Sequence, residues 1–183
     1  MFDKIKSNYI FKEMIKFIPK RKYLKIFIKN KKLQKKLNIS IDTYIDYYNQ
    51  IEIEIIPYMN RTGEFDYINK LININKERDE SLYHIYLNEN NEEIKRNYIY
   101  SNDEISKIKV IIDSEEKSLK EFFKKCHYIK EIKFIKFNRT DFTDYSSMFS
   151  CCEKLTNLDI SKLKTDNVET MRHMFACCRN LKI

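Results

Sequence analysis

A repeat of 26 residues near the C-terminal end constrains the fold of this chain more than any other feature. Phe123, Phe149 and Phe175 follow one another at this interval. The same interval separates two further sets: Cys126, Cys152 and Cys178, and Ile129, Leu155 and Leu181. A short strand or helix cannot bury its apolar side alone, so repeats of this length stack on their neighbours and form a continuous core. The period therefore predicts a short solenoid of stacked units.

Each unit contains two apolar patterns, which predict one strand and one helix. The first is L-x-x-L-x-L-x-x-L, formed by Ile129, Ile132, Phe134 and Phe137 and then by Leu155, Leu158, Ile160 and Leu163. Its central alternation is typical of a strand with one buried face. The second pattern has a three-residue spacing, formed by Phe142, Tyr145 and Met148 and then by Val168, Met171 and Met174. This spacing places the residues on one face of a helix, so we expect a leucine-rich-repeat-like unit.

The chain before the repeats divides into two further regions. Residues 1–57 carry apolar residues at three- and four-residue spacing among many lysines, which predicts a basic helical region. Residues 58–115 are expected to form a mixed α/β capping segment, with a helix over 64–80 and strands within 81–87, 93–100 and 107–113. Residues 114–116 could cap a helix that continues through 123. Residues 116–183 hold the solenoid, incomplete at its C-terminus, and the predicted fold class is α/β, or α+β overall.

The positive charge of the chain is concentrated in its first third. The net charge is +8, and residues 1–60 contain 13 Lys and Arg against 6 Asp and Glu. The run from Lys20 to Lys36 contains nine basic residues and no acidic one. Such a run can neutralise the phosphates of a nucleic acid or an anionic membrane. We favour a solvated helix face over either binding role.

Several kinds of catalytic and cofactor chemistry are disfavoured by the sequence. Gly63 is the only glycine, which excludes glycine-rich phosphate loops. The five cysteines are clustered and odd in number, so they do not form a disulfide framework, and they lack the usual C-x₂₋₄-C spacing of zinc sites. The repeated cysteines are expected to be buried as small apolar residues. We therefore predict a protein that is not an enzyme, without catalytic residues, a metal or a cofactor.

The sequence also bears on location. No uninterrupted apolar stretch approaches the roughly 18 residues of a membrane span. Lysines interrupt the start of the chain, where a signal peptide would need an apolar region. We therefore expect a cytoplasmic protein, with the nucleus and the cell surface as the alternatives.

Over residues 117–183 the repeat resembles the BspA-type leucine-rich-repeat family of surface proteins. The resemblance rests on the Met148–Phe149 pair, the cysteine that follows it, the L-x-x-L-D-I stretch from Leu155, and N-V-x-x-M from Asn167. It implies an α/β solenoid used for protein recognition or adhesion.

A second resemblance lies at residues 8–37, where the block E-x-x-x-F-I-P and the basic segment after it are similar to an F-box. F-boxes are often joined to leucine-rich repeats in substrate receptors of ubiquitin ligases. The resemblance implies that a Skp1-type adaptor would contact this segment, through Ile10, Met14, Ile18, Pro19 and Leu24.

These observations lead to three functional hypotheses. The first is a protein–protein interaction module, with F-box-type receptors as one possible class, that binds its partner through the outward side of the repeat strands. The residues expected there are Glu131, Lys133, Ile135, Asn157, Asp159 and Ser161. The alternative is a BspA-like surface or adhesion protein, and the third hypothesis is a basic nucleic-acid-associated module. The C-terminal edge of the repeats is a candidate surface for self-association.

Overall fold

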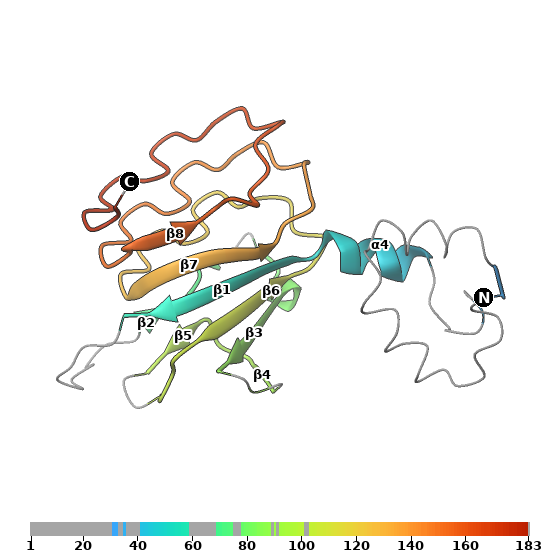
Figure 1. Cartoon of the computed structure of the whole chain (residues 1–183), viewed down its shortest axis with the longest axis horizontal. Helices are drawn as coiled ribbons and strands as arrows, with labels where there is room; N and C mark the ends of the chain where they lie inside the picture. Colours follow the sequence, from blue (N-terminus) through green and yellow to red (C-terminus); the bar gives the residue numbers. More distant parts are fainter. Residues whose placement is uncertain are drawn as a thin grey trace. The chain divides into compact units, whose positions relative to one another are not determined.

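The computed structural model describes residues 31–32, 35, 41–58, 69–74, 78–88, 90, 92–100 and 103–182, with side chains of the helix described from residue 45 onward. The chain divides into two compact units, residues 1–48 and 49–183. Helix α4 (Ile41–Asn49) ends at the boundary between them. The second unit contains the repeats and all the strands that the structure describes (Figure 1).

A six-stranded mixed sheet forms the framework of the second unit (Figure 1). Its strand order is β4-β3-β6-β1-β7-β8, and only the pairing of β7 with β8 is parallel. The strands are β1 (Ile51–Pro57), β3 (Tyr83–Leu87), β4 (Glu93–Ile94), β6 (Ile108–Ile112), β7 (Ile129–Lys136) and β8 (Asn157–Asp159). A separate two-stranded sheet pairs β2 (Asn69–Lys70) with β5 (Tyr98–Ile99).

Alternation of apolar and polar residues explains why the central strands have one buried face. In β1, Ile51, Ile53 and Ile55 are fully buried, whereas the residues between them are partly exposed. β6 alternates in the same way, and Ile53 lies opposite Val110 on one side and Phe134 on the other. Side chains point alternately to the two faces of a strand, so each of these strands contributes one apolar row to the same side of the sheet. That inner side carries the core.

Aromatic side chains fill much of the core beneath the sheet. The largest fully buried ones are Phe122, Phe123, Phe134, Phe142, Tyr145 and Phe149. All six belong to the first two of three successive turns of the chain, which we call coil 1 (residues 119–144), coil 2 (145–170) and coil 3 (171–182). Phe123, Phe149 and Phe175 stack with nearly parallel rings, at centroid separations of 5.5 and 5.7 Å.

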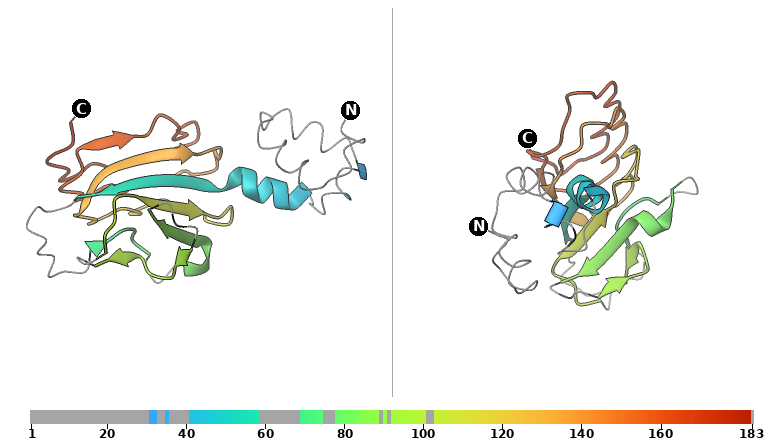
Figure 2. Two further views of the ribbon diagram at one scale, coloured as in Figure 1. Left: turned by 60° about the horizontal axis from the view of Figure 1, so that its bottom comes forward. Right: turned by 90° about the vertical axis from the view of Figure 1, so that its right-hand side faces the viewer.

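The predicted helices of the repeat are wrong. The segments around Met148 and Met174 are runs of tight turns, and Figure 2 shows the coils stacked without helices. Two positions in each coil have a positive φ near 60°: Glu121 and Lys125, Ser147 and Cys151, His173 and Cys177. A right-handed helix cannot include such residues, because their backbone has the opposite hand.

Hydrogen bonds between coils replace the bonds that a helix would form within itself. Alternate N–H groups donate to the carbonyl oxygen 25 residues later, at 2.7 to 3.0 Å. In coil 1 the donors are Glu121, Phe123 and Lys125, and in coil 2 they are Tyr145, Ser147, Phe149 and Cys151. Each left-handed residue costs about 1–2 kcal/mol. The ladder between coils and the burial of the aromatic rings offset that cost.

The segment before the repeats caps the first coil. The N–H of Asn73 donates to the carbonyl oxygen of Phe122 at 2.7 Å. The guanidinium group of Arg78 donates to the carbonyl oxygens of Ser118 at 3.2 Å and Lys120 at 2.5 Å. A preceding coil would supply N–H donors to these carbonyl groups, and Asn73 and Arg78 supply donors in its place.

The prediction of an α/β or α+β fold is therefore wrong, because the described part of the chain is built mostly from strands and turns. From residue 41 onward, α4 is its one α-helix. The last part of the region expected to be helical over 1–57 forms strand β1, and part of the helix expected over 64–80 is instead strand β2. The segment from 114 to 123 forms turns, with Glu116 accepting the N–H groups of Lys117 and Ser118.

Candidate functional site on the outer sheet face

The side of the six-stranded sheet opposite the core is the candidate functional site, and we call it the outer sheet face. Its members alternate with the buried rows of the strands and are half-buried or exposed. They are Glu93 from β4, His84 and Tyr86 from β3, Lys109 and Ile111 from β6, Glu52, Glu54 and Ile56 from β1, Glu131, Lys133 and Ile135 from β7, and Asn157 and Asp159 from β8.

One row of paired residues crosses all six strands of this face. Its members, in strand order, are Glu93, Tyr86, Lys109, Glu54, Lys133 and Asp159. The ammonium group of Lys109 lies 4.7 Å from the centre of the Tyr86 ring. Lys133 lies 3.7 Å from the Asp159 carboxylate, and Lys107 lies 2.7 Å from that of Glu54. Opposite charges facing each other across strands stabilise a sheet modestly, and here they also give the face an alternating charge pattern.

The six residues predicted from the repeat lie on or next to this face. Glu131 pairs with Asn157, and Lys133 pairs with Asp159, on the two parallel strands. Ile135 is half-buried, and its carbonyl oxygen accepts a bond of 2.6 Å from the ammonium group of Lys162. Ser161 follows β8 in a turn, and its N–H donates to the Asp159 carboxylate at 3.1 Å. Hydrogen bonds from the Ser161 side chain and backbone lower the pKa of Asp159.

A shallow hollow of about 150 Å³ interrupts the face. It is lined by Glu52, Glu54, Asn88, Asn90, Lys107, Lys109 and Ile135. Carboxylates and ammonium groups therefore surround a single apolar side chain. Such a lining suits a short polar side chain of a protein partner better than an apolar ligand, because both signs of charge can find a counterpart.

Sequence reasoning missed the part of the face that lies outside the repeats. The residues of β1, β3, β4 and β6 were not selected as binding candidates. β1 was assigned to a helical region, although the run I-E-I-E-I from Ile51 has the two-residue period of a strand. That period could have revealed β1, but its position beside β7 is a matter of topology and carries no local signal.

A histidine at the edge of the face is held between two carboxylates. The Nδ1 atom of His84 lies 3.1 Å from Glu93, and its Nε2 atom lies 3.1 Å from Asp113. Gln50 donates to the other oxygen of Asp113 at 2.8 Å, and Lys95 donates to Glu93 at 2.6 Å. Partial burial lowers the pKa of His84, but the hydrogen bonds with Asp113 and Glu93 outweigh it, so the pKa is raised. Only the doubly protonated ring can donate to both carboxylates.

This arrangement predicts a pH dependence of stability. The folded-state pKa of His84 is above its unfolded value of about 6.5. Its stabilising contribution is therefore complete below about pH 6.5 and is lost as the pH rises through the raised pKa. We expect urea denaturation to show that the free energy of unfolding falls as the pH rises through this range. The fall should be shallower in His84→Gln. Equal slopes in the two proteins would contradict this role.

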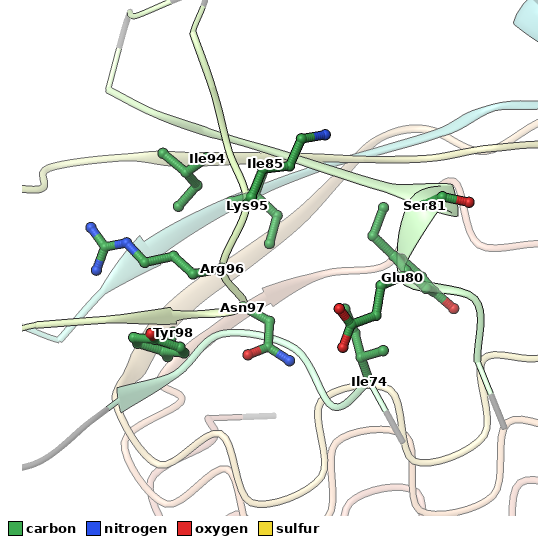
Figure 3. A pocket seen from close by; sticks show the side chains of 10 residues that line it. Ile74, Glu80, Ser81, Ile85, Ile94, Lys95, Arg96, Asn97 and Tyr98 are labelled. Atoms are coloured by element: carbon green, nitrogen blue, oxygen red, sulfur yellow. The ribbon is translucent and has the colours of Figure 1, made fainter. Parts of the chain in front are cut away.

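A pocket of about 410 Å³ lies on the inner side of the β3–β4 edge (Figure 3). Its lining residues are Ile74, Glu80, Ser81, Tyr83, Ile85, Ile94, Lys95, Arg96, Asn97 and Tyr98. The guanidinium group of Arg96 forms two hydrogen bonds with Asp103, at 2.7 and 2.8 Å. Its charge is thus already neutralised. The pocket was not predicted from the sequence.

Cys126, Cys152 and Cys178 follow the repeat and pack in or against the core, whereas Cys151 is half-buried and Cys177 is exposed. Cys126 and Cys152 are fully buried, and burial raises the pKa of the Cys126 thiol to about 12. The thiols of Cys152 and Cys178 donate to the carbonyl oxygens of Phe123 and Phe149, each at 3.0 Å. A buried thiol with a raised pKa is a poor nucleophile. Within the described residues, no three His, Cys, Asp or Glu side chains are grouped so that they could hold a metal ion.

The residues selected for the F-box-like segment, Ile10, Met14, Ile18, Pro19 and Leu24, lie outside the described residues, as does the basic run up to Asn30. Among the helices that the structure describes, none has the length and apolar character needed to cross a membrane.

Comparison with known protein families gives a match over the repeats. Residues 117–182 match the family described as "Mycoplasma protein of unknown function, DUF285". The match includes β7, β8 and all three coils, whereas β1 to β6 lie outside it. No curated protein and no solved structure matches the chain.

Proposed function

We propose that this chain is a non-enzymatic recognition protein of the surface or adhesion type, and that it binds a protein partner through the outer sheet face. The row of alternating charges across six strands carries this proposal. It offers a broad surface in which charged groups are paired with each other but stay accessible. Charge complementarity across an interface favours specificity and fast association.

The composition of the face supports a protein partner. Tyr86 and the half-buried Ile56, Ile111 and Ile135 supply apolar and aromatic contact area between the charged residues. Protein interfaces typically combine such a centre with polar surroundings. A nucleic acid would require an excess of positive charge to neutralise its phosphates. On this face, by contrast, Glu52, Glu54, Glu93, Glu131 and Asp159 balance the lysines.

The match of residues 117–182 supports the surface or adhesion type over an F-box-type receptor. The repeat is the part of the chain in which both the family match and the binding candidates occur. The F-box-type reading depends on residues 8–37, for which neither comparison nor structure adds support. Protease treatment of intact cells tests this location, since a surface protein would be degraded while a cytoplasmic protein would survive.

We expect the double variant Lys133→Ala/Asp159→Ala to lose partner binding. The partner would be captured with the tagged chain from its own cells, and its affinity then measured with purified proteins. A loss of at least about tenfold is expected if this ion pair lies near the centre of the interface. The melting temperature should change little, because an exposed ion pair contributes about 0–1 kcal/mol.

Lys120→Ala/Asp144→Ala provides a matched control. These two residues also form an exposed ion pair, at 3.9 Å, and Asp144 also accepts an N–H two residues later, as Asp159 does. They lie in the coils outside the six-stranded sheet. The control should bind normally. Equal losses in both double variants, or no loss in either, would exclude the outer sheet face as the binding surface.

A further inference from the structure

The pocket on the inner side of the β3–β4 edge combines apolar walls with polar groups (Figure 3). Its volume of about 410 Å³ is in the range of pockets that hold small molecules, roughly 300–1,000 Å³. The apolar part consists of Ile74, Ile85, Ile94 and the ring of Tyr98. All lining residues precede residue 117, so the pocket lies outside the part of the chain that matches the family.

The two basic residues of the pocket already have anionic partners. The ammonium group of Lys95 lies 2.6 Å from the Glu93 carboxylate. The guanidinium group of Arg96 forms its two hydrogen bonds with Asp103. Figure 3 shows both basic side chains directed away from the Glu80 carboxylate. An anionic ligand would therefore have to compete with carboxylates that are already in place.

The other polar groups of the pocket are acceptors without a partner. Among the described residues, the side chains of Glu80 and Asn97 form neither an ion pair nor a hydrogen bond. Tyr83 is 5% exposed, and its buried hydroxyl group has no hydrogen-bond partner in this part of the chain. Buried hydroxyl groups are rarely left unpaired. This hydroxyl is thus an independent sign that the pocket receives a polar group.

We propose that the pocket binds a primary ammonium group on a short apolar body, as in an alkylamine or the side chain of a lysine. An ammonium group has three donors and no acceptor, so it suits a pocket whose uncommitted polar groups can accept. Its charge would face Glu80, and its methylene groups would contact Ile85 and Ile94. A neutral ligand would leave the Glu80 carboxylate without a counter-charge.

NMR titration of the full chain with hexylamine, which is cationic at neutral pH, tests the proposal. Hexylamine should shift the signals of the Asn97 side-chain amide and of the Ile85 and Ile94 methyl groups. A dissociation constant of about 1 mM is expected for so small a ligand. Hexanoate has a similar apolar body and the opposite charge, and it should leave these signals unchanged at the same concentration.

A second ligand distinguishes the two sources of the ammonium group. Nα-acetyllysine N-methylamide carries the lysine side chain on a peptide backbone. If it shifts the same signals, the pocket accepts a lysine of another protein. If hexylamine binds and the lysine derivative does not, the pocket takes a free amine.

Glu80→Gln preserves the size of the side chain and removes its charge. It should weaken hexylamine binding about fivefold, since one ion pair is lost. Glu104→Gln is the matched control. Glu104 is likewise exposed and without an ion pair among the described residues, but it does not line the pocket. The control should bind hexylamine normally, and thermal unfolding would show that both variants are folded.

Two outcomes would overturn the proposal. One is equal affinity of wild type and Glu80→Gln for hexylamine, and the other is binding of hexanoate as strong as that of hexylamine. The pocket and the outer sheet face are tested separately, because they lie on opposite sides of the sheet. Lys133→Ala/Asp159→Ala should therefore bind hexylamine normally, whatever its effect on the protein partner.

Discussion

Replacing Phe149 with alanine is expected to lower the free energy of unfolding by about 3–5 kcal/mol. The Phe149 ring is fully buried and lies parallel to Phe123 and Phe175, at 5.5 and 5.7 Å. Its removal would leave a cavity between two coils and eliminate both ring contacts. The loss is a large part of the total stability of a typical domain, which is about 5–15 kcal/mol.

Urea denaturation of the wild type and the variant would measure this effect. Phe175→Ala is the matched control, because it removes the same side chain at the end of the same stack, where the ring is 43% exposed. We expect a loss of about 1 kcal/mol there, since less apolar area leaves the core. Equal losses at the two positions would contradict the stacked arrangement of the coils.

The second large effect is expected at Arg139, the most deeply buried charge of the coils. Its guanidinium group forms two hydrogen bonds with Asp141, at 2.8 and 2.6 Å, and a third with the carbonyl oxygen of Glu116 at 2.6 Å. It also lies 4.3 Å from the centre of the Phe142 ring. Arg139→Ala would leave the Glu116 carbonyl oxygen without its donor and would remove the guanidinium group that lies over the Phe142 ring. We expect a loss of about 2–4 kcal/mol.

Arg96→Ala is the control for this prediction. Arg96 also forms two hydrogen bonds with an aspartate and lies over an aromatic ring, Tyr100, but its side chain is 22% exposed, against 4% for Arg139. Water can therefore replace more of its interactions, and a loss of about 1 kcal/mol is expected. If denaturation shows Arg96→Ala to be the more damaging change, the importance assigned to the burial of Arg139 is wrong.

The stacking of repeats could be predicted from the sequence, whereas the backbone within each repeat could not. The interval of 26 residues follows directly from the stacked positions of Phe123, Phe149 and Phe175. The helices were predicted wrongly because the spacing of Tyr145 and Met148 fits both a helix and a run of turns. The decisive feature is a positive φ at Ser147 and Cys151. Neither serine nor cysteine indicates a positive φ in a sequence, as glycine would.

The candidate site, likewise, could be predicted only in part from the sequence. The outward residues of the repeat strands could be selected because alternation identifies one face of a strand. The contribution of Glu54 and Lys109 could not, since it depends on β1 pairing with both β6 and β7. Glu54 and Lys133, which are 79 positions apart in the chain, thus meet through sheet topology, for which a single sequence contains no local rule.

The central claim is that the outer sheet face contacts the partner, and site-specific photo-crosslinking tests it most directly. A photoreactive amino acid would replace Lys133 on the outer sheet face or, in a second protein, Lys120 in coil 1. Both side chains are exposed to a similar degree, 54% and 56%. Irradiation of cells that produce each protein should give a crosslinked partner from position 133 and none from position 120. A partner crosslinked from position 120 and absent from position 133 would contradict the claim.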